Sequence, residues 1–206
     1  METERRTRLT PDERRAQLVA LGVKSLADQP LESLTIDYLS ARAGVSRGLL
    51  FHYFTSKKGL HREVVRTARD SMLNATEPAP ELPPLERLRD TLTRIVRFVR
   101  EYRGTFFSLV RGVASGDTEV REVLEEARAS QADRVIRVFL ELGVADSELL
   151  RLALRSWVGF AEDILVDIAL NTEMPSEEIV LFLERSVTAI AASVYPRDDG
   201  AEALAL

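Results

Sequence analysis

The sequence predicts an all-α fold with a small three-helix head followed by a larger helical body. Apolar residues recur at helical spacing in nearly every segment after residue 9, and no segment alternates apolar and polar residues as a half-buried strand does. The chain has 206 residues, of which 45% are hydrophobic and 30% charged, so it can bury a substantial core. A proline-rich stretch at residues 77–84 predicts a linker between the two parts.

The first helix of the head is predicted to begin after Thr10. The Thr10 hydroxyl can cap the helix, Pro11 suits its first position, and Glu13 can reach back to complete a capping box. Apolar residues then follow at helical spacing until Gln29 and Pro30, which end the helix: Val19, Val23 and Leu26. Residues 1–9, which include three arginines, are predicted to form a flexible basic arm.

Two short amphipathic segments follow, separated by a glycine. Thr35 can cap the first segment, Gly44 supplies a left-handed turn, and Ser46 can cap the second segment. This arrangement is typical of a helix-turn-helix that reads DNA. A longer fourth helix, from about Ser56 to Leu73, is predicted to connect head and body because its apolar residues lie one turn apart: Leu60, Val64, Ala68 and Met72.

The body is predicted to be helical throughout. An apolar stripe over residues 85–102 is closed by Gly104, and a short helical segment follows at residues 105–115. A long helix is capped by Asp117 and stopped at Gly143. Two final helices are predicted at residues 148–170 and 175–194.

The helix-turn-helix block resembles the tetracycline-repressor-like (TetR) family. Nine positions of fixed spacing carry the resemblance: Gly44, Val45, Ser46, Gly48, Leu50, Phe54, Ser56, Lys57 and Leu60. The tyrosine usual in that family is Phe51 here, so one hydroxyl that can contact DNA is missing. The resemblance implies a ligand-responsive transcriptional regulator, a repressor by the family's habit, that binds double-stranded operator DNA as a homodimer.

The resemblance and the helical pattern together divide the chain into six parts. They are a basic arm (1–9), a helix-turn-helix DNA-binding domain (10–55), a connecting helix (56–76), a proline-rich linker (77–84), a helical effector-binding and dimerisation domain (85–195) and a flexible tail (196–206). The net charge differs between the two ends of the chain. Residues 1–75 hold 13 Lys and Arg against 9 Asp and Glu, a net charge of +4, whereas the remaining residues carry −9. Such a distribution would orient the molecule on a polyanion.

Eight residues of the head are expected to contact DNA: Thr35, Ser46, Arg47, Gly48, Leu49, His52, Tyr53 and Lys57. Arg47, Leu49 and His52 should point outward from the second short helix, where an arginine can bond guanine and a leucine can pack on a thymine methyl. Thr35, Tyr53 and Lys57 are expected to hold phosphates. For Tyr53 a place in the core beneath the turn is the competing interpretation.

The body is expected to bind a small-molecule effector that is largely apolar. Its aromatic residues fall in helices that should face one another, which favours a pocket, although aromatics at this spacing also form ordinary cores. The expected ligand-binding residues are Phe98, Tyr102, Phe106, Phe107, Arg111, Phe139, Arg155, Trp157 and Phe160. Arg111 and Arg155, with Glu162 and Asp163, are the charged residues expected to point inward, and exposure to solvent is the alternative.

The last two helices are expected to form a dimer interface. Residues 148–170 are apolar nearly all round, as a helix buried on more than one side must be. Closure of a monomer core by both helices is the alternative, and it does not explain this all-round apolarity. The residues expected at the interface are Phe182, Leu183, Val187, Ile190 and Val194.

Other classes of function have little support. Residues 44–48 fit the G-x-S-x-G pattern of a hydrolase nucleophile, but a helical pattern precedes Ser46, so no enzyme is predicted. The chain has no cysteine, and its two histidines fall in different helices, so neither a cofactor nor a metal is expected. The absence of a signal peptide or membrane span predicts a cytoplasmic protein. The alternative is a helical ligand-binding or interaction module that does not read DNA.

Overall fold

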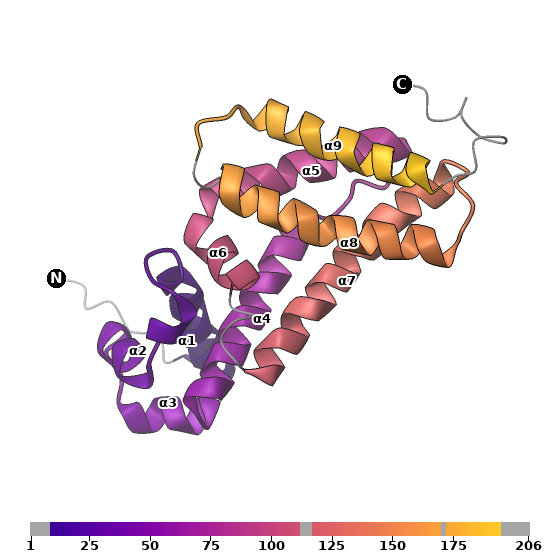
Figure 1. The fold of residues 1–206 in the computed structure, drawn as a ribbon. Helices are drawn as coiled ribbons and strands as arrows, with labels where there is room; N and C mark the ends of the chain where they lie inside the picture. Colours follow the sequence, from indigo (N-terminus) through magenta and orange to yellow (C-terminus); the bar gives the residue numbers. More distant parts are fainter. Residues whose placement is uncertain (1–8, 112–116, 170–171, 195–206) are drawn as a thin grey trace.

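The computed structural model describes residues 9–111, 117–169 and 172–194, apart from the side chains at positions 111, 168 and 169. All regular structure in these residues is helical, which confirms the all-α prediction (Figure 1). The helices are α1 (Pro11–Ser25), α2 (Ile36–Ala43), α3 (Arg47–Phe54), α4 (Lys57–Ala75), α5 (Pro84–Glu101), α6 (Arg103–Arg111), α7 (Thr118–Glu141), α8 (Glu148–Ile164) and α9 (Ser176–Ser193). A short 3-10 turn at Leu31–Ser33 precedes α2, and a π-helical segment at Leu165–Ala169 continues α8.

The helices of the head begin where the sequence predicts, whereas α1 ends at Ser25, before the predicted end at Gln29 and Pro30. Thr10 and Glu13 form the predicted capping box at the start of α1. The Thr35 and Ser46 hydroxyls accept hydrogen bonds from backbone amides of α2 and α3, at 3.0 and 3.3 Å. Gly44 has φ +65°, a left-handed conformation that costs a glycine little, and this turn sets α3 at its angle to α2.

The molecule is elongated, with the head at one end and the paired helices α8 and α9 at the other (Figure 1). Helices α4 and α7 lie side by side and lead from the head into the body. The head core does not stop at the predicted domain boundary. It also contains Leu109 of α6 and three residues from the first turns of α7, which are Val120, Val123 and Leu124.

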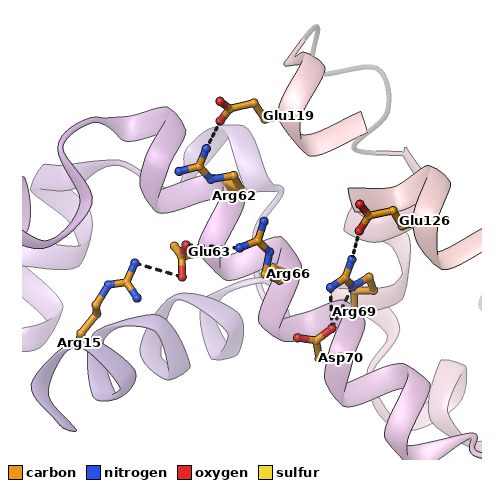
Figure 2. A network of polar contacts seen from close by, with 8 residues as sticks. All are labelled: Arg15, Arg62, Glu63, Arg66, Arg69, Asp70, Glu119 and Glu126. Carbon is orange, nitrogen blue, oxygen red and sulfur yellow. Dashed lines mark hydrogen bonds and ion pairs between the residues drawn. The ribbon is translucent and has the colours of Figure 1, made fainter. Parts of the chain in front are cut away.

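Two ion pairs fix the register of α4 against α7 (Figure 2). Arg62 pairs with Glu119 and Arg69 with Glu126, each with a nitrogen-oxygen distance of 2.6 Å. Both pairs join residues 57 positions apart in sequence, and they lie seven residues apart along each helix. The two helices therefore run parallel, and helices α5 and α6 make the crossover between them.

The body also contacts the head through α6. A Cβ atom built on Gly104 would lie 2.3 Å from the carbonyl oxygen of Leu26 and 2.5 Å from that of Ala27. Only a glycine lets the start of α6 approach the end of α1 so closely. Head and body therefore touch at two places, along α4 and α7 and at this crossing.

The basic arm and the tail predicted at the two ends fall outside the described residues, except for Leu9. Within the described part of the chain, no helix is long and apolar enough to cross a membrane.

Candidate nucleic-acid interface and effector cavity

Helix α3 is an exposed helix at the end of the molecule farthest from α9 (Figure 1). Its inner face is anchored by Leu50 and Phe54, which are buried in the head core. Its outer face presents Arg47, Gly48 and His52, which are exposed as the sequence predicts. The helix has only eight residues, so its position depends on packing against the head and not on its own stability.

Arg47 is held by its neighbour in α2. Its Nε lies 2.7 Å from Oδ1 of Asp37, and both side chains are well exposed. Because Asp37 occupies the Nε edge, the two terminal nitrogens of the guanidinium remain available for a bidentate bond. Asp37 was not among the residues predicted to form the DNA-binding site.

The other residues predicted to contact DNA differ in how far their side chains are exposed. Leu49 is half-buried, so it projects less than expected. Tyr53 is also half-buried and packs against the head core, which agrees with the competing interpretation of this residue. The Lys57 amine lies on the surface and donates to the carbonyl of Glu32 at 2.8 Å, while Thr35 uses its hydroxyl as the cap of α2.

Ser46 is a helix cap between two helices, as predicted, so the G-x-S-x-G pattern has no strand before it. His61 of α4 is buried in the head, where its Nε2 lies 2.7 Å from the carbonyl oxygen of Leu34. Leu34 directly precedes the cap of α2, so this hydrogen bond ties the helix-turn-helix to α4. Burial lowers the pKa of the His61 imidazole, and nearby Lys57 lowers it further, against the opposing effects of the Leu34 bond, Glu32 and Asp117.

The body contains a cavity of about 930 Å³ between the end of α4, the α4–α5 connection and helices α5, α7 and α8. Its wall combines apolar residues with charged ones such as Arg87, Arg134 and Glu141, and the apolar part includes Leu88, Ile95, Phe106, Val138 and Trp157. The Trp157 indole donates to the Ser186 hydroxyl at 2.8 Å, so its polar group is satisfied outside the cavity. A cavity of this size and lining suits a small, mainly apolar molecule.

Only two of the nine residues predicted to bind the ligand, Phe106 and Trp157, line this cavity. Phe139 is fully buried in the core, and Phe98 is buried against the ring of Tyr102. Tyr102, Phe107, Arg155 and Phe160 are exposed at the surface. These six side chains therefore do not line this cavity, because the helices turn them away from it. The side chain of Arg111 lies outside the described part of the chain.

Arg134 of α7 is the most unusual charged group at the cavity. Its guanidinium donates to the carbonyls of Leu73 and Thr76, at 3.2 and 3.1 Å, where α4 ends. No carboxylate lies within ion-pair distance of it in the described residues. Burial lowers the Arg134 pKa, whereas the carbonyl end of a helix favours a cation. Of the four charged residues expected to point inward, Glu162 lines the cavity and pairs with Arg128 at 2.7 Å, while Arg155 and Asp163 are exposed.

A second surface lies on α8 and α9. Five large apolar residues are exposed there and form what we call the outer face: Leu149, Leu152 and Phe160 of α8 with Leu181 and Phe182 of α9. The Phe160 and Phe182 rings lie 6.1 Å apart, so the two helices contribute to one surface. Soluble monomers seldom keep a patch of this kind uncovered.

Of the five residues predicted at the dimer interface, only Phe182 belongs to the outer face. Phe182 is 46% exposed, as expected, but Leu183 and Val187 are 0% exposed and belong to the core of the subunit. Ile190 and Val194 are half-buried against the same core. The side of α9 that carries Leu183 and Val187 faces α5 and α8, which explains why these two residues are buried within the subunit.

The fold and the exposed helix α3 define a helix-turn-helix protein with a helical body that contains a cavity. Residues 18–64 match the model of the bacterial regulatory proteins of the tetR family, and residues 84–190 match that of a tetracyclin repressor-like C-terminal domain. The second match alone covers just over half of the chain. The chain therefore belongs to the tetR family of bacterial regulatory proteins.

Individual relatives agree with this assignment. The HTH-type transcriptional regulator BetI of Escherichia coli O139:H28 is 32% identical over 80 residues, which cover 37% of this chain and 41% of BetI. A tetR-family transcriptional regulator from Streptomyces coelicolor has a similar structure, with 25% identity and a TM-score of 0.76 over 91% of this chain and 85% of that one. AibR, solved with isovaleryl coenzyme A and operator DNA, shares the fold at 15% identity, with a TM-score of 0.65 over 85% of this chain and 98% of AibR.

His61 predicts how stability depends on pH. Its pKa is lowered in the folded state, so above the ordinary value of 6.5 both states are neutral and the residue contributes nothing to the pH dependence. As the pH falls through 6.5, the unfolded chain takes up a proton that the folded head resists, and stability is lost until the folded-state pKa is reached. Urea unfolding at pH 7.5 and 5.5 should therefore show a smaller loss for His61→Gln than for the wild type.

His52→Gln is the matched control. His52 is exposed, so this variant should retain the full loss of stability at pH 5.5. An equal loss in wild type and His61→Gln would contradict the role given to the buried imidazole.

Proposed function

We propose that the protein is a ligand-responsive repressor that binds operator DNA as a homodimer and is released by a small molecule. One observation carries the DNA-binding role. Helix α3 follows the left-handed turn at Gly44 and presents an arginine oriented by Asp37, in a chain that belongs to the tetR family. BetI is named a transcriptional regulator, and AibR combines the same fold with operator DNA and an acyl coenzyme A, which supports the proposal. Because operator DNA lies in the bacterial cytoplasm, the proposed location of the protein is the cytoplasm.

The outer face is the proposed dimer interface. A two-fold axis there would pair α8 and α9 with their counterparts in a four-helix arrangement. In one chain α3 lies at the end of the molecule opposite α9 (Figure 1). Both α3 helices of such a dimer would then lie far from the interface, where one duplex can contact them. Such dimers read two half-sites about 34–36 Å apart.

The cavity is the proposed effector site. Met72 and Asn74 of α4 line it, and the same helix carries the head at its other end. Met72 also packs against both hydrophobic cores. A ligand that favours one position of α4 over another would therefore change the spacing of the two heads.

Arg134 gives the cavity its proposed chemical preference. An effector with an apolar body and an anionic end can bury the body against Trp157 and bond Arg134 with the charged end. The bond would compete with the carbonyls of Leu73 and Thr76 and so loosen the end of α4. We propose that this competition couples ligand binding in the cavity to a change in the position of the head.

The first prediction of the proposed function separates base reading from phosphate holding. Arg47→Ala should weaken binding by about 1–3 kcal/mol per half-site at duplexes that carry the read guanine, and little at others. Lys57→Ala should weaken binding to all duplexes alike and reduce the slope of log affinity against log salt by about one per subunit. Fluorescence anisotropy with duplexes selected from a random library measures both.

Base selectivity that changes with Lys57→Ala but not with Arg47→Ala would reverse the two roles. If the wild type selects no duplex at all, the protein is instead a helical ligand-binding or interaction module.

The second prediction is that Phe182→Arg yields a folded monomer that has lost operator affinity. The substitution places an unpaired charge in the proposed interface, which costs about 3–5 kcal/mol and should raise the dimer dissociation constant by at least about 100-fold. Phe107→Arg is the matched control, because Phe107 is also 46% exposed but lies on α6. Sedimentation at micromolar concentration distinguishes them, and a monomeric wild type would refute the interface.

The third prediction concerns Trp157, the only tryptophan of the chain. Decanoate, a straight-chain carboxylate, should change Trp157 emission and release DNA over the same concentration range. Arg134→Ala should remove both effects, whereas Arg155→Ala should leave them unchanged because Arg155 is exposed on α8. Decylamine has a similar apolar body with the opposite charge and should bind more weakly. Release of DNA without a change in Trp157 emission would place the effector site elsewhere.

A further inference from the structure

Phe51 is an apolar side chain in an unusual place. Its ring is 46% exposed on α3, the helix that the proposed function turns toward DNA. The other apolar and aromatic residues of α3, histidine apart, are at least half-buried: Leu49, Leu50, Tyr53 and Phe54. No fold requirement keeps Phe51 in solvent, and its exposed apolar surface is stabilised only when it is covered.

The chemistry of the DNA major groove limits what can cover this ring. The base edges there consist of hydrogen-bond donors and acceptors, with the C5-methyl group of thymine as the apolar exception. A phenyl ring placed on a donor or acceptor would remove water from it without replacing the hydrogen bond, which is unfavourable. On a methyl group the ring excludes water at no such cost.

Arg47 is the neighbour of Phe51 that can make a polar base contact beside a methyl contact of the ring. Arg47 lies four residues earlier, hence one turn away on the same face of α3. Its guanidinium is fixed at the Nε edge by Asp37, which leaves the terminal nitrogens for the O6 and N7 atoms of guanine. Four residues of helix rise about 6 Å, which is about two base-pair steps.

We propose that Phe51 reads a thymine methyl group in the major groove, within about two base pairs of a guanine read by Arg47. Asp37 acts as a positioning residue for Arg47. The inference rests on the proposed operator binding and adds the base that one side chain selects. It also gives the substitution of the family's usual tyrosine a positive role, because a phenyl ring covers a methyl group without leaving a hydroxyl to be paired.

The test begins with selection of bound duplexes from a random-sequence library by the full-length protein. In the enriched duplex, each thymine is then replaced in turn by deoxyuridine, which lacks only the C5-methyl group. One thymine per half-site, near the guanine whose replacement weakens Arg47-dependent binding, should lose about fourfold in affinity. Deoxyuridine at other thymines should have no effect.

Phe51→Ala supplies the matched comparison. This variant should bind thymine and deoxyuridine duplexes equally, so that the fourfold preference disappears, while its thermal unfolding matches the wild type because the ring is exposed. Phe51→Tyr retains the ring and should retain the preference. A purely structural role for Phe51 would weaken both duplexes in the same ratio.

The outcomes separate the two proposals. An enriched duplex that tolerates deoxyuridine everywhere, or a thymine preference that survives in Phe51→Ala, overturns this inference and leaves operator binding intact. A wild-type protein that enriches no sequence overturns the proposed function and this inference with it.

Discussion

The parallel pairing of α4 with α7 is the constraint on which the rest of the molecule depends. Two exposed ion pairs contribute only about 0–1 kcal/mol each, so they cannot be what holds the helices together. The stabilisation comes from apolar residues that the helices share, such as Val65 and Ala68 packed in one core with Val123. The ion pairs act on register instead (Figure 2). Because both join residues 57 apart, a one-residue slip would break Arg62–Glu119 and Arg69–Glu126 together.

This pairing explains why head and body behave as one structure in spite of their different compositions. The first turns of α7 complete the core of the head, while the last turn of α4 closes the cavity of the body. The start of α7 therefore lies in the head, and the end of α4 lies in the body. Arg134 joins the two helices, because it belongs to α7 and donates hydrogen bonds to the carbonyl end of α4. A cation there interacts favourably with the negative end of the helix dipole. Its removal would leave those carbonyls without this hydrogen-bond donor.

The local features of the fold could be predicted from the sequence, because each depends on adjacent residues. Thr10, Thr35 and Ser46 cap helices through hydroxyls that lie next to the amides they bond, and Gly44 needs only its own backbone freedom. The cavity could not be predicted in this way. Whether an aromatic ring lines a gap depends on the angles between four helices, so Phe106 and Trp157 look no different in sequence from Phe139. Arg134 likewise has no sequence signal that distinguishes it from Arg137.

The outer face could not be predicted from the sequence either. Periodicity places the apolar residues of α9 on one face, but it does not show which of them meet the subunit core and which meet a partner. The structure assigns Leu183 and Val187 to the core and leaves Phe182 exposed beside Phe160. Helices α8 and α9, which carry this exposed apolar surface, and helix α3, which carries Phe51, lie at opposite ends of the molecule (Figure 1). The proposed two-fold axis at one end would leave both Phe51 rings free at the other, and the α4–α7 pairing holds each head in place relative to its own α8 and α9.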